Sequence, residues 1–101
     1  MSTKEKIDAV VKYLKNEFPK GLIEHYMDND LGTRSFRAYK SNEFLYVIKF
    51  HRKSWDNTTD INSLLTQLDI ANSFRKFPPN SNVIATVKGV KGDYSLDLDP
   101  R

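Results

Sequence analysis

The chain has 101 residues, of which 39% are hydrophobic and 29% charged, with a formal net charge of +3 and no cysteine. This composition excludes a disordered or fibrous chain, and the missing cysteine excludes disulfides, thiolate nucleophiles and cysteine-ligated zinc. The length predicts a single domain over residues 1–101, and the sequence has neither a secretion signal nor an apolar run of membrane-spanning length, so we expect a cytoplasmic protein with no membrane contact.

Residues 3–18 are predicted to form an amphipathic helix. The apolar residues between Ile7 and Phe18 recur with helical spacing and form one stripe. Ser2 and Glu5 have the spacing of a capping box, in which each side chain accepts a hydrogen bond from the other residue's backbone N–H. A Pro-Lys-Gly sequence after Phe18 is expected to end the helix.

A first strand is predicted over residues 21–28. Two alternating sets of side chains could form its buried face: Leu22, Glu24 and Tyr26, or Ile23, His25 and Met27. We favour the set that begins with Ile23. The Asn-Asp-Leu-Gly sequence at 29–32 predicts a turn after this strand.

The stretch from Arg34 to Trp55 is rich in aromatic and basic residues and contains a single acid, Glu43. It predicts a hairpin of two strands, over about 33–40 and 43–52. The loop between them decides the register, because a slip of one residue moves every side chain to the other face. A two-residue turn at Ser41-Asn42 and a three-residue loop that also includes Glu43 are the alternatives. Ser-Asn is a poor type I′ pair, so we favour the longer loop.

The two loop lengths divide the hairpin differently between its faces. With the two-residue turn, Phe36 and Ala38 would lie beside Leu45 and Val47. The three-residue loop instead gives one core face and one outer face. The core face would hold Phe36, Ala38, Phe44, Tyr46, Ile48 and Phe50, and the outer face Arg37, Tyr39, Leu45, Val47, Lys49 and His51.

Residues 53–59 are predicted to be a polar connection, and a helix is predicted to begin near Asp60 with Thr59 or Asp60 as its cap. Its apolar residues form two sets on nearly opposite sides: Ile61, Leu64, Leu65 and Leu68, then Ile70, Phe74 and Phe77. Either the helix breaks near Leu68-Asp69, with Asp69 capping the second piece, or one helix is apolar on two sides and needs a further partner. We favour the break.

The last part of the chain predicts two strands. Two prolines end the helix, residues 82–88 have the β-branched content of a buried strand, and the glycines of the 89–93 turn are expected in left-handed positions. The alternation of Tyr94, Leu96 and Leu98 predicts a short edge strand. The resulting order, α-β-β-β-α-β with one further strand, predicts an α+β domain with a mostly antiparallel sheet and helices packed on one face.

The leading functional hypothesis is a non-catalytic module that binds another protein, with a homodimer as one form of that contact. Phenylalanines on the second side of a helix need a cover, which a partner would supply if the helix does not break. The candidate contact residues are Ile70, Phe74 and Phe77.

Binding of RNA or single-stranded DNA is the alternative. Such strands are held by bases stacked on aromatic rings while basic side chains follow the phosphates. The preferred hairpin register sends most of the rings into the core, which counts against this reading. The candidate residues are Arg34, Arg37, Tyr39, Lys49, His51, Arg52 and Lys53.

A small metal-dependent enzyme is the third hypothesis, and we lean against it. It needs two or three carboxylates that converge on one point, whereas no metal-binding motif and no nucleophile–base pair is evident. We therefore name no catalytic residue, metal or cofactor. The residues that prompt the hypothesis are Asp28, Asp30, Glu43, His25 and His51.

Overall fold

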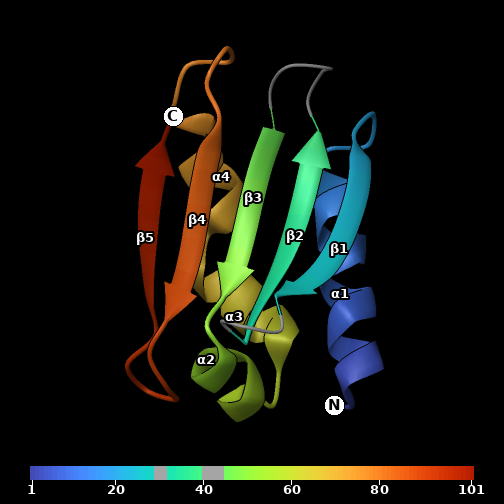
Figure 1. Ribbon diagram of the computed structural model, residues 1–101, viewed down its shortest axis with the longest axis vertical. Helices are drawn as coiled ribbons and strands as arrows, with labels where there is room; N and C mark the ends of the chain where they lie inside the picture. Colours follow the sequence, from blue (N-terminus) through green and yellow to red (C-terminus); the bar gives the residue numbers. More distant parts are fainter. Residues whose placement is uncertain (29–31, 40–44) are drawn as a thin grey trace.

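A five-stranded sheet covered by helices on one face forms the domain, as the computed structural model shows in Figure 1. The structure describes residues 1–28, 32–39 and 45–101. In chain order the elements are α1 (Thr3–Glu17), β1 (Leu22–Asp28), β2 (Thr33–Tyr39), β3 (Leu45–Phe50), α2 (Arg52–Asn57), α3 (Ile61–Leu68), α4 (Ile70–Arg75), β4 (Val83–Lys88) and β5 (Ser95–Pro100). The predicted α+β class and element order are confirmed. None of the described helices is long and apolar enough to cross a membrane.

The strands lie side by side in chain order, with β1 at one edge and β5 at the other. Neighbouring strands are antiparallel except β3 and β4, which are parallel. A parallel pair needs a crossover connection. Helix α2, at the lower end of β3 in Figure 1, and helices α3 and α4, which pass behind the sheet, form that crossover. The described helices lie on one side of the sheet, and none of them covers its other face.

The register of β2 and β3 is the one that the three-residue loop predicts. Phe36 lies opposite Ile48, and Ala38 lies opposite Tyr46. Residues 40–44, which include the loop itself and Phe44, lie outside the described residues. With this pairing, alternate side chains of both strands point toward the helices, so the hairpin contributes its aromatic rings to the core.

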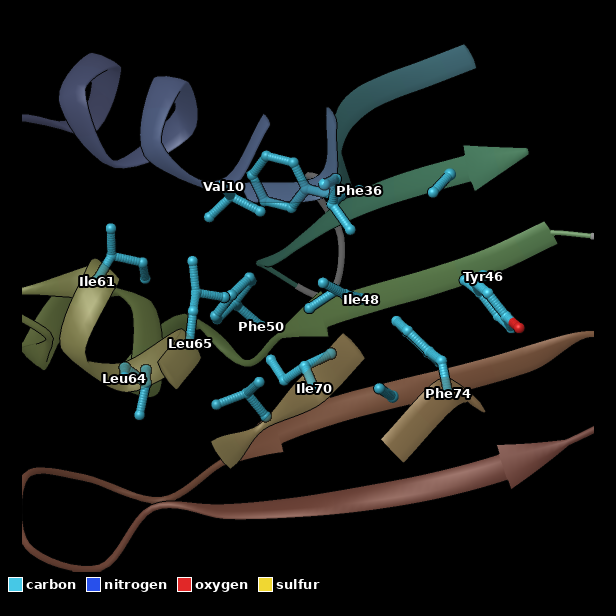
Figure 2. Close-up of a cluster of buried hydrophobic side chains, with 14 of the residues drawn as sticks. Val10, Phe36, Tyr46, Ile48, Phe50, Ile61, Leu64, Leu65, Ile70 and Phe74 are labelled. Carbon is cyan, nitrogen blue, oxygen red and sulfur yellow. The ribbon is translucent and has the colours of Figure 1, made fainter. Parts of the chain in front are cut away.

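The core lies between the helical layer and the inner face of the sheet, as Figure 2 shows. Phe36, Ile48 and Phe50 are fully buried, and the Tyr46 ring stacks on the Phe74 ring with centroids 4.4 Å apart. From the N-terminal helix, Val10 contributes to the same cluster (Figure 2). Close packing of this kind contributes most of the stability of a small domain.

Helix α1 forms as its sequence predicts. Ser2 and Glu5 make both hydrogen bonds of the capping box, at 3.2 and 3.0 Å. Val10 and Leu14 are buried on the side that faces the sheet. Lys6 is also buried, at 7% exposure, although the sequence places it outside the apolar stripe.

Residues 53–59 are not the polar connection that the sequence predicts. Residues 52–57 form α2, so β3 ends at Phe50 rather than near Arg52. Trp55 is 4% exposed and packs against Phe50 with ring centroids 5.2 Å apart. Hydrogen bonds from Ser54 Oγ to the Gly89 carbonyl and from Thr58 Oγ1 to the Ser54 carbonyl hold this turn of helix. A six-residue helix is too short for its periodicity to be seen in the sequence, which is why the prediction failed.

The helix after Asp60 breaks at Asp69, as we favoured. Asp60 caps α3 by accepting a hydrogen bond from the Ser63 amide at 3.2 Å. Asp69 has φ 52° and ψ 49°, the left-handed conformation that ends a helix. Its carboxylate accepts hydrogen bonds from the Asn72 side chain. The break changes the direction of the chain and turns Ile70 and Phe74 into the core.

Candidate functional site

The structure separates the seven nucleic-acid candidates into three places. Alternate residues of a strand share a face, so Arg37, Tyr39 and Lys49 lie together on the open face of the sheet. Arg34 lies on the helix side, with its guanidinium carbon 5.0 Å from the centre of the Trp55 ring. The remaining three, His51, Arg52 and Lys53, lie at the start of α2.

His51 is not on the outer face of β3, where the sequence predicts it. It follows the end of the strand and is the N-cap residue of α2, with φ −61° and ψ 147°. Its neighbours there are Arg52 and Lys53, and with Gly89 and Val90 they line a cavity of about 460 Å³. Of the nucleic-acid candidates expected on the outer face, Arg37, Tyr39 and Lys49 therefore remain there.

Arg37 is the centre of an aromatic and cationic cluster on the open face. Its Nε and Nη2 atoms donate to the Tyr26 hydroxyl at 3.1 and 2.8 Å, and its Nη1 atom donates to the Tyr39 hydroxyl at 3.4 Å. The guanidinium also lies over the Tyr26 ring, 4.6 Å from its centre. The hydrogen bonds to Tyr39 and Tyr26 raise the pKa of Arg37, so the cluster keeps its positive charge.

Tyr26 is the member of this cluster that the sequence did not single out. It belongs to the alternating set that we expected on the exposed face of the first strand, and it is 36% exposed. Cross-strand pairing makes it a neighbour of Arg37, since Tyr26 lies opposite Ser35 and Glu24 opposite Arg37. The alternation of side chains in the sequence indicated that Tyr26 is exposed, but only the β1–β2 register shows that it lies beside Arg37.

The open face has acids as well as bases. Asp97 and Asp99 project from β5, and Asp97 forms an ion pair with Lys88. Val47, which was expected on the outer face, is on that face but only 5% exposed, because it lies between Arg37 and Ile84 on the neighbouring strands. On the β4–β5 half of this face the bases Lys88 and Arg101 form ion pairs with Asp97 and Asp99, so the excess of positive charge lies on β2 and β3.

The β1 edge combines exposed apolar side chains with backbone groups that pair with no other strand in the described part of the chain. Five large hydrophobic residues are exposed in that part, and three of them belong to β1: Leu22 at 65%, Tyr26 at 36% and Met27 at 46%. The helix-side set, Ile23 and His25, is half-buried, as we favoured, although Met27 of the same set is exposed. His25 packs on Phe36 with ring centroids 4.8 Å apart, and burial together with the charge of Arg34 lowers its pKa.

The residues predicted to contact another protein belong to the chain's own core. Ile70 and Phe74 are 0% exposed, and Phe77 is half-buried against the same cluster. Their cover is therefore the sheet, because the helix break turns them inward. Ile70 and Phe74 therefore offer no exposed surface to a partner, while contact through the half-buried Phe77 stays a prediction.

The carboxylates and histidines that suggested a metal site are not brought together. Among residues 1–28, 32–39 and 45–101, no three His, Asp or Glu side chains are close enough to hold a metal ion. His25 is on the helix side of β1, whereas His51 follows β3. Asp30 and Glu43 lie outside the described residues.

Comparison with known proteins gives no match, whether with family models, with curated proteins or with solved structures.

Proposed function

We propose that this chain is a small, non-catalytic cytoplasmic module that acts through protein–protein contact along the β1 edge, and that the strand it takes up is β1 of a second copy. The observation that carries the proposal is the concentration of exposed apolar side chains on this edge strand. Leu22, Tyr26 and Met27 stand next to a row of backbone donors and acceptors, the combination on which another strand adds to a sheet.

The two edges of the sheet differ in how they are protected. Natural edge strands are guarded against pairing by charges and prolines. The β5 strand, Ser-Leu-Asp-Leu-Asp-Pro, has both, with Asp97, Asp99 and Pro100. The β1 strand, Leu-Ile-Glu-His-Tyr-Met-Asp, also carries two acids, Glu24 and Asp28, but it has no proline, and its Leu22 and Met27 side chains are exposed. The contrast supports β1 as the edge that is meant to pair.

The β1 sequence is complementary to itself in an antiparallel arrangement centred on His25. Residues that lie directly opposite each other share a face of the sheet, so Ile23 would lie opposite Met27 of the second copy on the helix side. On the open side, Glu24 would lie opposite Tyr26 of the second copy. The Tyr26 hydroxyl oxygen accepts hydrogen bonds from Arg37, so its own proton is left to be donated to the Glu24 carboxylate of the second copy.

The arrangement also places Leu22 opposite Asp28 of the second copy, which gives a test that depends on the register. Leu22 is 65% exposed, so its replacement has little effect on folding. Leu22→Glu puts two carboxylates opposite each other twice per dimer, and at up to about 1 kcal/mol for each pair the dissociation constant should rise about tenfold. Leu22→Lys puts opposite charges together and should leave the dimer intact or strengthen it.

Sedimentation equilibrium of the wild type and both variants measures these constants, with Ser95→Glu on the exposed face of β5 as the matched control. A wild-type chain that stays monomeric at the highest concentration would contradict the homodimer. Equal weakening by Leu22→Glu and Leu22→Lys would contradict the register centred on His25.

Binding of single-stranded nucleic acid by the open face is a second candidate, and the Arg37 cluster is the observation that favours it. Two tyrosine rings and a guanidinium lie on an uncovered sheet with Lys49 on the neighbouring strand. Bases stack on such rings while the cations contact phosphates. Glu24, Asp97 and Asp99 on the same face oppose this binding, so we place it second.

Fluorescence anisotropy with a labelled single-stranded oligonucleotide, at low and moderate salt, tests the second candidate. Loss of a stacking ring by Tyr39→Ala should weaken binding about tenfold, and Arg37→Gln should also reduce its salt dependence. Lys76→Gln removes an exposed charge outside the open face and serves as the control. Absence of binding at low salt, where attraction between polyions is strongest, would eliminate this candidate.

A further inference from the structure

Trp55 has the one unsatisfied polar side-chain atom that is buried in the described part of the chain. Its Nε1 atom is shielded from solvent and has no hydrogen-bond partner. The ring is fixed by core contacts with Phe36 and Phe50, at centroid distances of 5.9 and 5.2 Å. A buried donor without an acceptor lowers the stability of the folded chain unless something satisfies it.

Two cations lie against the same tryptophan. The Nζ atom of Lys6 is 5.6 Å from the ring centre and donates to the Trp55 carbonyl oxygen at 2.6 Å. The guanidinium of Arg34 is 5.0 Å from the ring centre. Lys6 is 7% exposed, so its charge is largely removed from water. Two positive charges are thus held around one aromatic ring.

Neither cation has an acidic partner in the part of the chain that the structure describes. Arg34 donates to His25 Nε2 at 3.3 Å and to Met27 Sδ at 3.4 Å, and both of these acceptors are uncharged at neutral pH. Among the described residues, the Lys6 ammonium has the Trp55 carbonyl oxygen as its acceptor. Buried charges are normally paired with opposite charges, so this cluster has an excess of positive charge and of hydrogen-bond donors.

A cavity of about 230 Å³ opens beside this cluster. Met27, Gly32, Arg34, Arg52, Trp55 and Asp56 line it. The stem of Arg52 lies over Gly32, where an added Cβ atom would be 3.1 Å from the Arg52 Cδ atom. Because Gly32 has no side chain, the Arg52 side chain can lie at the wall of the cavity that Arg34 also lines.

The carboxylate at the cavity wall does not cancel this charge. Asp56 Oδ2 is 3.7 Å from Arg52 Nε, and both side chains are mostly exposed. An exposed ion pair with this spacing contributes little. Among the described residues, the walls carry two guanidinium groups and one carboxylate, and the Lys6 ammonium lies 5.6 Å from the centre of the Trp55 ring.

We propose that this cavity binds a phosphate group through the guanidinium groups of Arg34 and Arg52. The planar fork of a guanidinium matches two oxygens of a phosphate, and two forks with a third cation nearby suit a doubly charged oxyanion. The site lies beside α2 and is distinct from the open-face cluster. The shared chemistry is a phosphate, either free or at the end of a nucleotide.

Trp55 is the single tryptophan of the sequence, so the tryptophan emission reports on the surroundings of this ring, which include the cavity. We expect a saturable change of emission when inorganic phosphate is added at constant ionic strength, with sodium chloride as the balancing salt. Arg34→Met keeps an apolar stem over the ring and removes the charge, and it should raise the phosphate dissociation constant about tenfold.

Arg52→Met serves as the second variant, because its side chain is 77% exposed and its replacement leaves the core unchanged. It should also raise the dissociation constant severalfold. Lys76→Met removes an exposed charge elsewhere and should leave the constant unchanged. A change of emission that does not saturate, or that is equal in wild type and both arginine variants, would overturn the proposal.

A nucleoside 5′-monophosphate, titrated beside the unphosphorylated nucleoside, distinguishes the two sources of phosphate. Tighter binding of the monophosphate than of inorganic phosphate, with no binding of the nucleoside, would identify a nucleotide as the ligand. Equal or weaker binding would identify free phosphate. Binding of the bare nucleoside with the affinity of the monophosphate would show that the phosphate is not what is recognised, and would overturn the proposal.

Discussion

The glycines of the turn between β4 and β5 show how one residue's freedom shapes this protein. Gly89 and Gly92 have φ values of 92° and 88°, a region that other residues rarely adopt. A Cβ atom on Gly89 would collide with the Asp93 carbonyl oxygen, whereas one on Gly92 would meet no atom within 4 Å. The sequence predicted both left-handed positions, but the collision depends on how the turn closes.

Gly92→Ala and Gly89→Ala therefore form a matched pair. Both suffer the strain of a positive φ, about 1–3 kcal/mol. The second also has to move the turn backbone, so its loss of stability should be larger. Urea unfolding of the two variants measures the difference, and equal losses would contradict the backbone contact at Gly89.

His25 links the stability of the fold to pH. Burial and the charge of Arg34 lower its pKa below the ordinary 6.5. The unfolded chain therefore binds a proton at His25 more readily than the folded chain does. The contribution of neutral His25 to the free energy of unfolding is complete above about pH 6.5 and is lost as the pH falls through the lowered pKa.

The free energy of unfolding, measured by urea between about pH 7.5 and about pH 5.5, should therefore fall with acidification in this window. His25→Gln removes the titrating group and should flatten the curve between these two values. A variant that keeps the wild-type slope would show that another group is responsible.

At the scale of the element, the break between α3 and α4 determines how deeply two phenylalanines of the same apolar set are buried. Phe74 is 0% exposed and contacts the Tyr46 and Phe18 rings, while Phe77 is half-buried. The sequence showed the two apolar sides and left the break as one of two alternatives. The left-handed conformation of Asp69 chooses between them.

Phe74→Ala should lower the free energy of unfolding by about 3–5 kcal/mol, because it removes a fully buried ring. Phe77→Ala should cost clearly less, since part of that ring remains in water. Thermal or urea unfolding of both variants tests the difference. Similar losses, or a change of oligomeric state caused by Phe74→Ala alone, would contradict its role in the chain's own core.

Helix α2 is the element that sequence reasoning missed, and it also positions the proposed phosphate cavity. Long elements with many apolar repeats were predicted well, because their periodicity is sampled over several turns. Residues 52–57 contain one large apolar residue, Trp55, so no period can be read from them. Its burial depends on Phe36 and Phe50, which are brought to it by the sheet.

At the scale of the whole molecule, the difference between the two sheet edges predicts where another chain adds. Hydrogen exchange should show slow exchange in β4 at every protein concentration, because β4 pairs on both sides. The β1 amides that face away from β2 should become protected as the concentration rises and the dimer forms. The corresponding amides of β5 should not change. Concentration-independent exchange in β1 would contradict the edge contact.

From the sequence alone, the order of the elements other than α2, the hairpin register between β2 and β3 and the inward set of its side chains could be predicted. These follow from local causes: alternation along a strand, helical spacing, the loop length and the turn glycines. Only the tertiary structure decided which surface is left for a partner. It buried Ile70 and Phe74, separated His51 from Lys49, and brought Tyr26 to Arg37 and Lys6 to Trp55. Those contacts join residues from different elements, so no local pattern of the sequence encodes them.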